Sequence, residues 1–521
     1  MTYRARHLRI PPAATAPGRR PAESRPAESR PAESRPAEPR PAEPGPAESG
    51  AESSRGRRGT LLLIIATVAF ALALARFALH LAEPSFLARM FDLGIYRDGG
   101  LIVRHAYHFR SGQPTPLYDW VSPGGGNPFT YPPFAAGIFA VLSFLAPAAL
   151  QWGMTALSFG ALIVAVWLTM DSSGVPKSRI RTAAVVAVSA VALWTQPVQS
   201  NFGLGQINLL LMAAIIWDLR PAGARGGLAG PAGQADRPGR WWTGAATGIA
   251  AGIKLTPLIV IPYLLVTRRF RQAAVAAGAF AATVGIGFAV MPGASMAYWW
   301  SGLFDRANGT PRANLEFFFA SAWNQSLRGF LSRIMQHAQL AAGPWLIAAL
   351  LTAAVGVLCA TWLHNDGFPM LGLLTCALTG LLISPISWLH HWVWVAPWLA
   401  ALTAMAIRSR GAARRSWACL AVLIALVFAE GPALASITGS QRELNVVTDV
   451  PMKQPLAWHG LELLAGNVYV LAGAAGLLAL FGWGVARAFQ PGRLMTAVPD
   501  AALEPVGVRS GQTVPGGETG P

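Results

Sequence analysis

The stretch "TLLLIIATVAFALALARFALHLA", residues 60–82, decides the fold, because it stays apolar over the length of a bilayer crossing. A helix needs about 17–25 predominantly apolar residues to cross the hydrocarbon core. Of the 521 residues in the chain, 53% are hydrophobic and only 12% are charged, whereas soluble domains usually carry about 25% charged residues. Lipid admits only helices or closed barrels, and these runs lack the alternation of barrel strands. The sequence therefore predicts an all-α polytopic membrane protein.

Apolar runs of comparable character recur along most of the chain. Together with residues 60–82 they predict about 11–13 transmembrane or re-entrant helices and an outer loop domain. Pro257 is expected to break one helix, because proline lacks the backbone N–H that a helix interior needs. The further runs are 132–148, 149–170, 182–199, 207–219, 241–253, 255–266, 272–292, 343–364, 368–386, 391–407, 416–438 and 467–488.

The charge of the chain follows the membrane pattern. The net charge of +17 could indicate nucleic-acid binding, but no polar face interleaves basic and aromatic residues. The basic residues instead gather in short loops, which the positive-inside rule places in the cytoplasm. These loops are 176–181, 220–240, 268–271 and 408–415. The same rule then places 83–131, 200–206, 293–342, 385–391 and 439–466 outside, and it requires 132–170 to make a single net crossing.

The chain divides into three parts by composition. Residues 1–58 carry a repeat of Arg-Pro-Ala-Glu-Ser type, which cannot bury a core and is expected to be disordered. Residues 59–488 form the predicted membrane domain, and 489–521 form a second polar tail that we also expect to be disordered. The three cysteines lie in apolar runs without ligand spacing, so the sequence predicts neither a disulfide framework nor a metal site.

Candidate acid–base and sugar-contacting residues lie in the predicted outer segments. Asp92 follows the first membrane run and could accept a proton from a sugar hydroxyl, although it could equally be a solvated loop residue or a helix cap. Asp98 and Asp119 are of the same type, so residue type does not choose among the three. Tyr96 and Tyr131 are candidates for contact with a sugar.

Amide side chains mark two further segments. Gln206 and Asn208 belong to "SNFGLGQINLL", residues 200–210, at a predicted outer helix end. Asn324 and Gln325 belong to "FFFASAWNQSLRGFLSRI", residues 317–334, which reads as an amphipathic helix on the outer membrane surface. These amides could hydrogen-bond substrate hydroxyls, or those at 206 and 208 could cap a helix.

Candidate phosphate ligands are cationic or imidazole groups. Lys254 stands in "AAGIKLTPLIV", residues 250–260, where a charge among apolar residues either serves function or snorkels to the interface. Arg328 could hold a phosphate, and Arg333 could do the same or contact lipid headgroups. His390 and His391 lie in "LISPISWLHHWVWVAP", residues 382–397. Adjacent residues of a helix point about 100° apart, so one of the two is expected to face the site and the other to support it. The alternative for this pair is a place in the interfacial aromatic belt.

The motifs occur in a specific order: the Asp92 loop, "FTYPPF", "GQINLLL", "KLTP", "NQSLRG" and "SPISWLHHWVW". In this order the chain resembles glycosyltransferase family 87 over roughly residues 60–490, and within it the polyprenyl-phosphomannose-dependent α-mannosyltransferases. The resemblance implies a GT-C-type fold in the plasma membrane, with the active site on the outer side. Because the sequence shows no convincing set of metal ligands, we expect no cofactor. The resemblance also implies a polyprenyl-phosphate-mannose donor, a glycolipid or lipoglycan acceptor of the cell envelope, and inversion to an α-mannoside, expected to be α-1,2.

Site residues also follow from the resemblance. It implies that Asp92 is the general base and that Lys254, Asn324, Arg328, His390 and His391 belong to the site. The chain departs from the family in its repeat tail and in the loop at about 104–130, which leaves the acceptor open.

Two other functions fit parts of the sequence. An arabinofuranosyltransferase that uses lipid-linked arabinose would share the scaffold, and nothing in the residues identifies the sugar. A transporter or flippase would be expected to show paired broken helices in repeated halves. The break at Pro257 has no counterpart in the sequence, which disfavours transport.

Overall fold

The computed structural model describes residues 46–82, 90–104, 117–121, 128–220, 240–300, 319–337, 341–430, 456 and 458–489. The predicted disordered tails lie largely outside these residues, at 1–45 and 490–521. Ser54–Pro521 form one compact unit, distinct from Met1–Ser53. The fold and the site described below belong to the larger unit.

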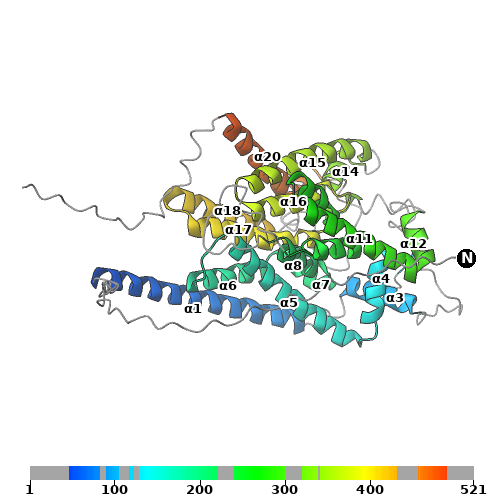
Figure 1. The fold of residues 1–521 in the computed structure, drawn as a ribbon, viewed down its shortest axis with the longest axis horizontal. Coiled ribbons are helices and arrows are strands. Elements are labelled where there is room, and N and C mark those ends of the chain that lie inside the picture. Colours follow the sequence, from blue (N-terminus) through cyan, green and yellow to red (C-terminus); the bar gives the residue numbers. More distant parts are fainter. Residues whose placement is uncertain are drawn as a thin grey trace, which may run out of the picture. The chain divides into compact units, whose positions relative to one another are not determined.

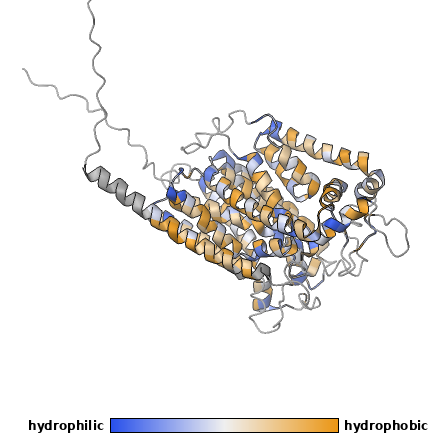
Figure 2. Ribbon diagram, turned by 90° about the horizontal axis from the view of Figure 1, so that it is seen from below, coloured by the Kyte–Doolittle hydropathy of each residue, from blue (hydrophilic) through white to orange (hydrophobic). Residues whose placement is uncertain are grey.

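Within the described part of the chain, six long apolar helices confirm the all-α polytopic membrane class. A span of Gly59–Leu79 lies within α1 (Pro46–Ala82), and a seventh span is possible where α6 (Arg179–Leu193) and α7 (Gln196–Leu204) bend by 69°. Figure 2 shows hydrophobic residues along most of the drawn helices. The other five long helices are α5 (Pro147–Ser172), α11 (Phe270–Val290), α15 (Ala342–Asn365), α18 (Gly411–Glu430) and α20 (Val468–Phe489).

These helices present their apolar side chains outward. Leu350 and Leu351 of α15 are each 64% exposed, as is Leu426 of α18. Large apolar surfaces of this kind are rare on soluble monomers and are typical of helices that face lipid.

Short helices complete the described part of the chain. With its 10 residues, α4 (Pro133–Leu142) rises only about 15 Å and is too short to cross a bilayer, which agrees with the single crossing expected for 132–170. Beta structure among the described residues is limited to two isolated bridges. The other short elements are α3 (Phe91–Val103), α8 (Asn208–Leu219), α9 (Ala245–Ile253), η1 (Thr256–Ile259), α10 (Val260–Val266), α12 (Pro292–Trp299), α14 (Leu327–Ile334), α16 (Pro369–Ile383), η2 (Leu389–Trp394), α17 (Val395–Arg408) and α19 (Gly460–Gly466).

The helices pack in pairs around the short elements that carry the candidate site. Figure 1 shows α15 beside α16 and α17 beside α18, and α3 packs on α4. The α3–α4 contact is aromatic, because the rings of Tyr96 and Phe139 stack at 4.5 Å between centroids. In turn, η2 packs against α7 and α8. Segments from four distant parts of the sequence thus converge.

Glycines let α9 approach α11 closely. Gly244, Gly248 and Gly252 recur every four residues and so lie on one helix face. A Cβ atom at Gly248 would overlap the carbonyl oxygen of Ala276, and one at Gly252 would overlap the side chain of Thr283. This small-residue face is the kind that membrane helices use to pack backbone against backbone.

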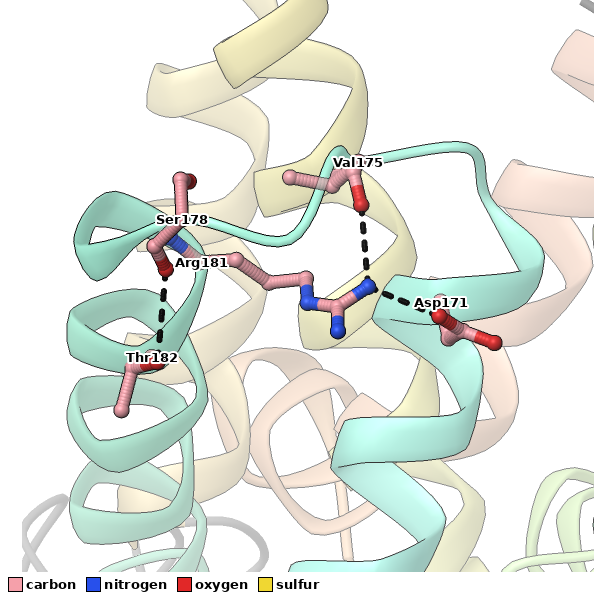
Figure 3. Close-up of polar contacts among 5 residues, drawn as sticks. All are labelled: Asp171, Val175, Ser178, Arg181 and Thr182. Carbon is pink, nitrogen blue, oxygen red and sulfur yellow. Dashed lines mark hydrogen bonds and ion pairs between the residues drawn. The ribbon is translucent and has the colours of Figure 1, made fainter. Parts of the chain in front are cut away.

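A partly buried ion pair fixes the turn between α5 and α6. Nη1 of Arg181 donates to Asp171 Oδ1 at 2.7 Å and to the carbonyl oxygen of Val175 at 3.1 Å (Figure 3). The Ser178 hydroxyl caps α6 by accepting from the backbone N–H of Arg181. The basic loop predicted at 176–181 therefore contributes one arginine to the interior of the protein.

Candidate active site

Asp92 lies in the first turn of α3 and begins a network of polar side chains. Its Oδ2 accepts a hydrogen bond from Nε2 of Gln206 at 2.6 Å. The carboxyl is only partly exposed, and burial raises the pKa of Asp92 to about 6, against the opposing effects of the Gln206 hydrogen bond and the Lys254 charge. Of the three acidic candidates, Asp92 is therefore the one joined to the predicted amides, and its pKa suits a general base near neutral pH.

Gln206 connects Asp92 to two buried tyrosines. Its Oε1 accepts from the hydroxyl of Tyr96 at 2.8 Å and from that of Tyr131 at 3.3 Å, and the two hydroxyls lie 2.6 Å apart. Tyr131 immediately precedes the proline pair that begins α4. The predicted sugar-contacting residues Tyr96, Tyr131 and Gln206 therefore gather beside Asp92.

Lys254 stands where the helix breaks. At Ile253 α9 ends, and Lys254 adopts an extended backbone with φ −146° and ψ 125° just before η1, which contains Pro257. Its Nζ donates to Oδ1 of Asn208 at 2.8 Å and lies 5.6 Å from the ring centroid of Tyr131. The predicted break at Pro257 is thus present, and it turns the ammonium toward the tyrosines.

The two histidines occupy different positions. Nε2 of His391 lies 3.1 Å from Nζ of Lys254. His390 is 5% exposed, and its ring nitrogens have no hydrogen-bond partner among the described residues. Its carbonyl oxygen accepts from Nδ2 of Asn208 at 3.0 Å, and its ring packs edge-on against that of His391 at 4.8 Å. One histidine thus meets the cation while its neighbour supports the segment.

Exposure separates the reactive groups from their supports. Asp92, Lys254 and His391 are partly exposed. The residues that hold them, by contrast, are at most 9% exposed: Tyr96, Tyr131, Gln206, Asn208 and His390. A base, a cation and an imidazole can therefore meet a substrate, whereas the amides and tyrosines mainly meet one another.

Asn324 and Gln325, which the sequence offers as substrate contacts, hydrogen-bond the backbone of neighbouring segments in the fold. Both are fully buried. The Asn324 side chain donates to the carbonyl oxygen of Pro385 at 3.1 Å and accepts from the backbone N–H of Ser387 at 2.9 Å. The Gln325 side chain bonds the backbone of Ala322, Gly466 and Tyr469. These amides hold the segment that leads into the histidines.

The two arginines of the same region also differ. Arg333 is fully buried and donates to Oδ1 of Asn467 at 2.9 and 2.6 Å and to the carbonyl oxygen of Asn324. The expectation that Arg333 meets a phosphate or lipid headgroups is therefore wrong, because its donors are used inside the protein. Its partner Asn467 was not singled out from the sequence; the signal was a lone amide at the start of an apolar run.

Arg328 remains available to a ligand. Its guanidinium carbon lies 3.3 Å from the ring centroid of Phe319 and 5.1 Å from that of Trp345. Its Nε has no hydrogen-bond partner among the described residues. Among those residues, no contact joins Arg328 to Asp92, Lys254 or His391.

Comparison with known proteins agrees with the motifs. A model of glycosyltransferase family 87 matches residues 129–385. A polyprenol-phosphate-mannose-dependent alpha-(1-2)-phosphatidylinositol pentamannoside mannosyltransferase of Mycobacterium tuberculosis is 34% identical over 440 residues, which cover 82% of this chain and 88% of the relative. A protein of the same description from Mycolicibacterium smegmatis is 31% identical, covering 71% of this chain and 80% of its own.

A further relative has a similar description, with a phosphatidylinositol mannoside in place of the pentamannoside. This polyprenol-phosphate-mannose-dependent alpha-(1-2)-phosphatidylinositol mannoside mannosyltransferase of Mycobacterium tuberculosis is 30% identical, covering 55% of this chain and 64% of the relative. No solved structure matches the chain.

Proposed function

The chain belongs to glycosyltransferase family 87 and is a membrane glycosyltransferase, and we propose that it transfers mannose from polyprenol-phosphate-mannose to a phosphatidylinositol mannoside. The new linkage is α-1,2, as in the descriptions of the relatives. The acceptor is a glycolipid of the cell envelope, and both substrates are reached from the bilayer.

One observation supports this assignment above all: a carboxylate and an ammonium lie at opposite ends of one side-chain network. Asp92 bonds Gln206, and Lys254 bonds Asn208 and contacts His391. Glycosyl transfer from a lipid phosphate needs a base at the acceptor hydroxyl and positive charge at the departing phosphate. The two ends of the network meet these two needs.

The reaction proceeds as a displacement at the anomeric carbon. Asp92 takes the proton of the acceptor hydroxyl as the oxygen of that hydroxyl attacks the anomeric carbon. The bond from the anomeric carbon to the phosphate oxygen of the donor breaks as the new bond forms. The bonding electrons leave with polyprenol phosphate, whose added negative charge is stabilised by the ammonium of Lys254 and a hydrogen bond from His391. Attack opposite to the leaving group inverts the configuration, so a β-linked donor gives an α-mannoside.

Two other residues complete the donor site in this proposal. The guanidinium of Arg328, placed against Phe319 and Trp345, is a second ligand for the donor phosphate. The buried ring of His390 supports His391 from behind and can accept or donate a proton when the phosphate is bound.

We place the reaction on the outer side of the plasma membrane. The basic loops at 220–240 and 268–271 belong in the cytoplasm by the positive-inside rule. Asp92 follows α1 and precedes the short α4, so a crossing of the membrane by α1 would put it on the opposite side from those loops. An outer site suits a lipid-linked donor, because no cytoplasmic nucleotide sugar is required.

A transfer assay tests the function. Membranes that contain the protein are given polyprenol-phospho-[¹⁴C]mannose and a phosphatidylinositol mannoside, and the product linkage is analysed. We expect a radiolabelled product whose new mannose is removed by an α-1,2-specific mannosidase, with none from membranes that lack the protein. Transfer from lipid-linked arabinose in place of mannose would overturn the donor assignment in favour of an arabinofuranosyltransferase.

A further inference from the structure

Two buried amides lie between the cation and the carboxylate. Lys254 Nζ donates to Asn208 Oδ1 at 2.8 Å, Asn208 Nδ2 lies 3.4 Å from Gln206 Oε1, and Gln206 Nε2 donates to Asp92 Oδ2 at 2.6 Å. The middle contact is the longest. Asn208 and Gln206 are 9% and 5% exposed, so water does not readily replace these contacts.

The chemistry of the two ends fixes the direction of every bond between them. An ammonium can only donate hydrogen bonds and an ionised carboxylate can only accept them. The amide oxygen of Asn208 must therefore face Lys254, which turns its nitrogen toward the carbonyl oxygen of His390 and toward Gln206. Gln206 must then turn its oxygen to Asn208 and its nitrogen to Asp92.

The tyrosines alone would not impose this order. A hydroxyl can donate or accept, so Tyr96 and Tyr131 could pair with either end of the Gln206 amide. Asn208 differs from the tyrosines, because it presents its Nδ2 group to Gln206 Oε1 and an amide N–H can only donate. Without Asn208, the Gln206 amide could turn over when Asp92 is protonated, because its oxygen would then accept from the carboxyl O–H, and this orientation would favour the protonated acid.

We propose that Asn208 and Gln206 are positioning residues that connect Lys254 to Asp92 through one directed chain of hydrogen bonds, which keeps an N–H of Gln206 on the carboxylate. This inference rests on the proposed function, in which Asp92 is the base. It changes the role expected for both amides, from contact with a sugar to control of the base. Hydrogen bonds aligned in one direction also polarise one another, so binding of a phosphate to Lys254 alters the strength of the hydrogen bond from Gln206 to Asp92.

Among the residues that the structure describes, few other charged groups lie on the elements packed around Asp92. Its own helix carries Arg97 and Asp98, and Tyr96 and Tyr131 reach it through Gln206. The packed helices α4 and α7 carry no titratable side chain, and Lys254 and the two histidines come from the break at 254 and from η2. A change in the titration of the base can therefore be assigned to few groups.

The test is the pH dependence of kcat/KM for transfer of mannose from the lipid donor. A phosphodiester donor does not titrate between pH 4.5 and pH 8. The fall of kcat/KM on the acid side of the pH profile, here called the acid limb, therefore reports protonation of the base. In the parent enzyme we expect this limb near pH 6, with activity falling as the pH drops and Asp92 takes up a proton. Gln206→Leu removes a hydrogen bond to the ionised carboxylate and should move the limb upward by about one unit.

Asn208→Leu is the decisive variant, because Asn208 is joined to Asp92 only through the Gln206 amide. It should also move the limb upward, by roughly half a unit or more, since the Gln206 amide is no longer held in one orientation. The matched control is Gln325→Leu. It removes a fully buried amide that takes no part in the series of hydrogen bonds from Lys254 to Asp92. It is expected to reduce the amount of folded protein without moving the limb.

The outcomes separate the two proposals. If both Gln206→Leu and Asn208→Leu lower kcat while the acid limb stays at the parent position, the amides are merely structural and the inference fails. The inference also fails if Gln206→Leu moves the acid limb and Asn208→Leu does not. In that case Asn208 does not connect Lys254 to Asp92. A parent enzyme that transfers no mannose would instead overturn the proposed function.

Discussion

At the scale of single residues, the environment of each polar group decides its role more than its type does. Asp92, Asp98 and Asp119 are chemically alike, yet Asp92 is the one bonded to Gln206. Likewise, Arg328 keeps a buried Nε without a partner among the described residues, whereas Arg333 spends its donors inside the protein. The reacting groups are those that the interior holds in place but leaves partly exposed.

Replacement of the base should separate chemistry from binding. Asp92→Asn keeps the shape of the side chain and can still pair with Gln206 through its oxygen, but it cannot take up a proton. We expect the rate of mannose transfer to fall about 10²–10⁴-fold, with donor binding nearly unchanged. The comparison is made by single-turnover transfer and by equilibrium binding of polyprenol-phosphate-mannose.

The matched control is Asp119→Asn, because Asp119 is an exposed acid. It should leave the rate within a factor of about two, because surface substitutions rarely matter. A near-normal rate for Asp92→Asn would remove Asp92 from the mechanism.

At the scale of elements, the small-residue face of α9 decides where Lys254 lies. Gly248 and Gly252 set α9 against α11, and the helix ends one residue after Gly252. A shift of α9 relative to α11 would therefore disturb the 2.8 Å contact between the ammonium and Asn208. Packing and chemistry are linked here over a single turn of helix.

Gly248→Val should disrupt the packing of α9 on α11 and so displace Lys254. The added side chain would overlap the Ala276 carbonyl of α11, and overpacking of this kind costs about 1–3 kcal/mol. We expect a lower melting temperature in detergent and a loss of transfer activity greater than the loss of folded protein. The control is Gly278→Val in α11, where an added Cβ meets nothing within 4 Å; equal effects of the two substitutions would contradict the argument.

Much of this element pattern could be predicted from the sequence. Apolar length located the long helices, and Pro257 located the break beside Lys254. The histidine pair was expected to lie on an α-helix, but it lies in the 3₁₀ segment η2. Both geometries point adjacent side chains apart, so the expectation that a single histidine meets the site did not depend on the helix type.

The roles of Asn324, Gln325 and Arg333 could not be predicted in the same way. Their motif marks a region that the fold needs, and sequence alone does not separate a residue that binds substrate from one that holds a loop. The partners that these side chains find in the fold are distant in the sequence: Asn324 and Pro385 are 61 positions apart, and Arg333 and Asn467 are 134 positions apart. Long-range pairing of polar groups carries no local signal.

At the scale of the whole molecule, the alternation of long and short helices places the polar segments. The long α5 carries the chain across the membrane after the short α4. The proposed orientation therefore puts Asp119 and Lys177, both exposed, on opposite sides.

Cysteine labelling tests that orientation. In a Cys419→Ser background, the other two cysteines are buried. We expect a membrane-impermeant maleimide to label Asp119→Cys in intact cells and Lys177→Cys only after the cells are opened. The reverse pattern would place the site in the cytoplasm. Labelling of both in intact cells would contradict a crossing by α5.

The shortness of α8 and α9 has a consequence for the choice of donor. These helices have 12 and 9 residues, so they rise at most about 18 and 14 Å, against about 30 Å for the hydrocarbon layer. Asn208 and Lys254 stand at their ends, so in the proposed mechanism the donor phosphate would bind at a depth that the length of these helices sets. A sugar phosphate dissolved in water would have to give up its hydration to reach that depth, whereas one tethered to polyprenol already resides at the boundary of the bilayer. If Lys254 binds the phosphate as proposed, depth in the bilayer would favour a lipid as the carrier of the sugar more than the shape of any headgroup would.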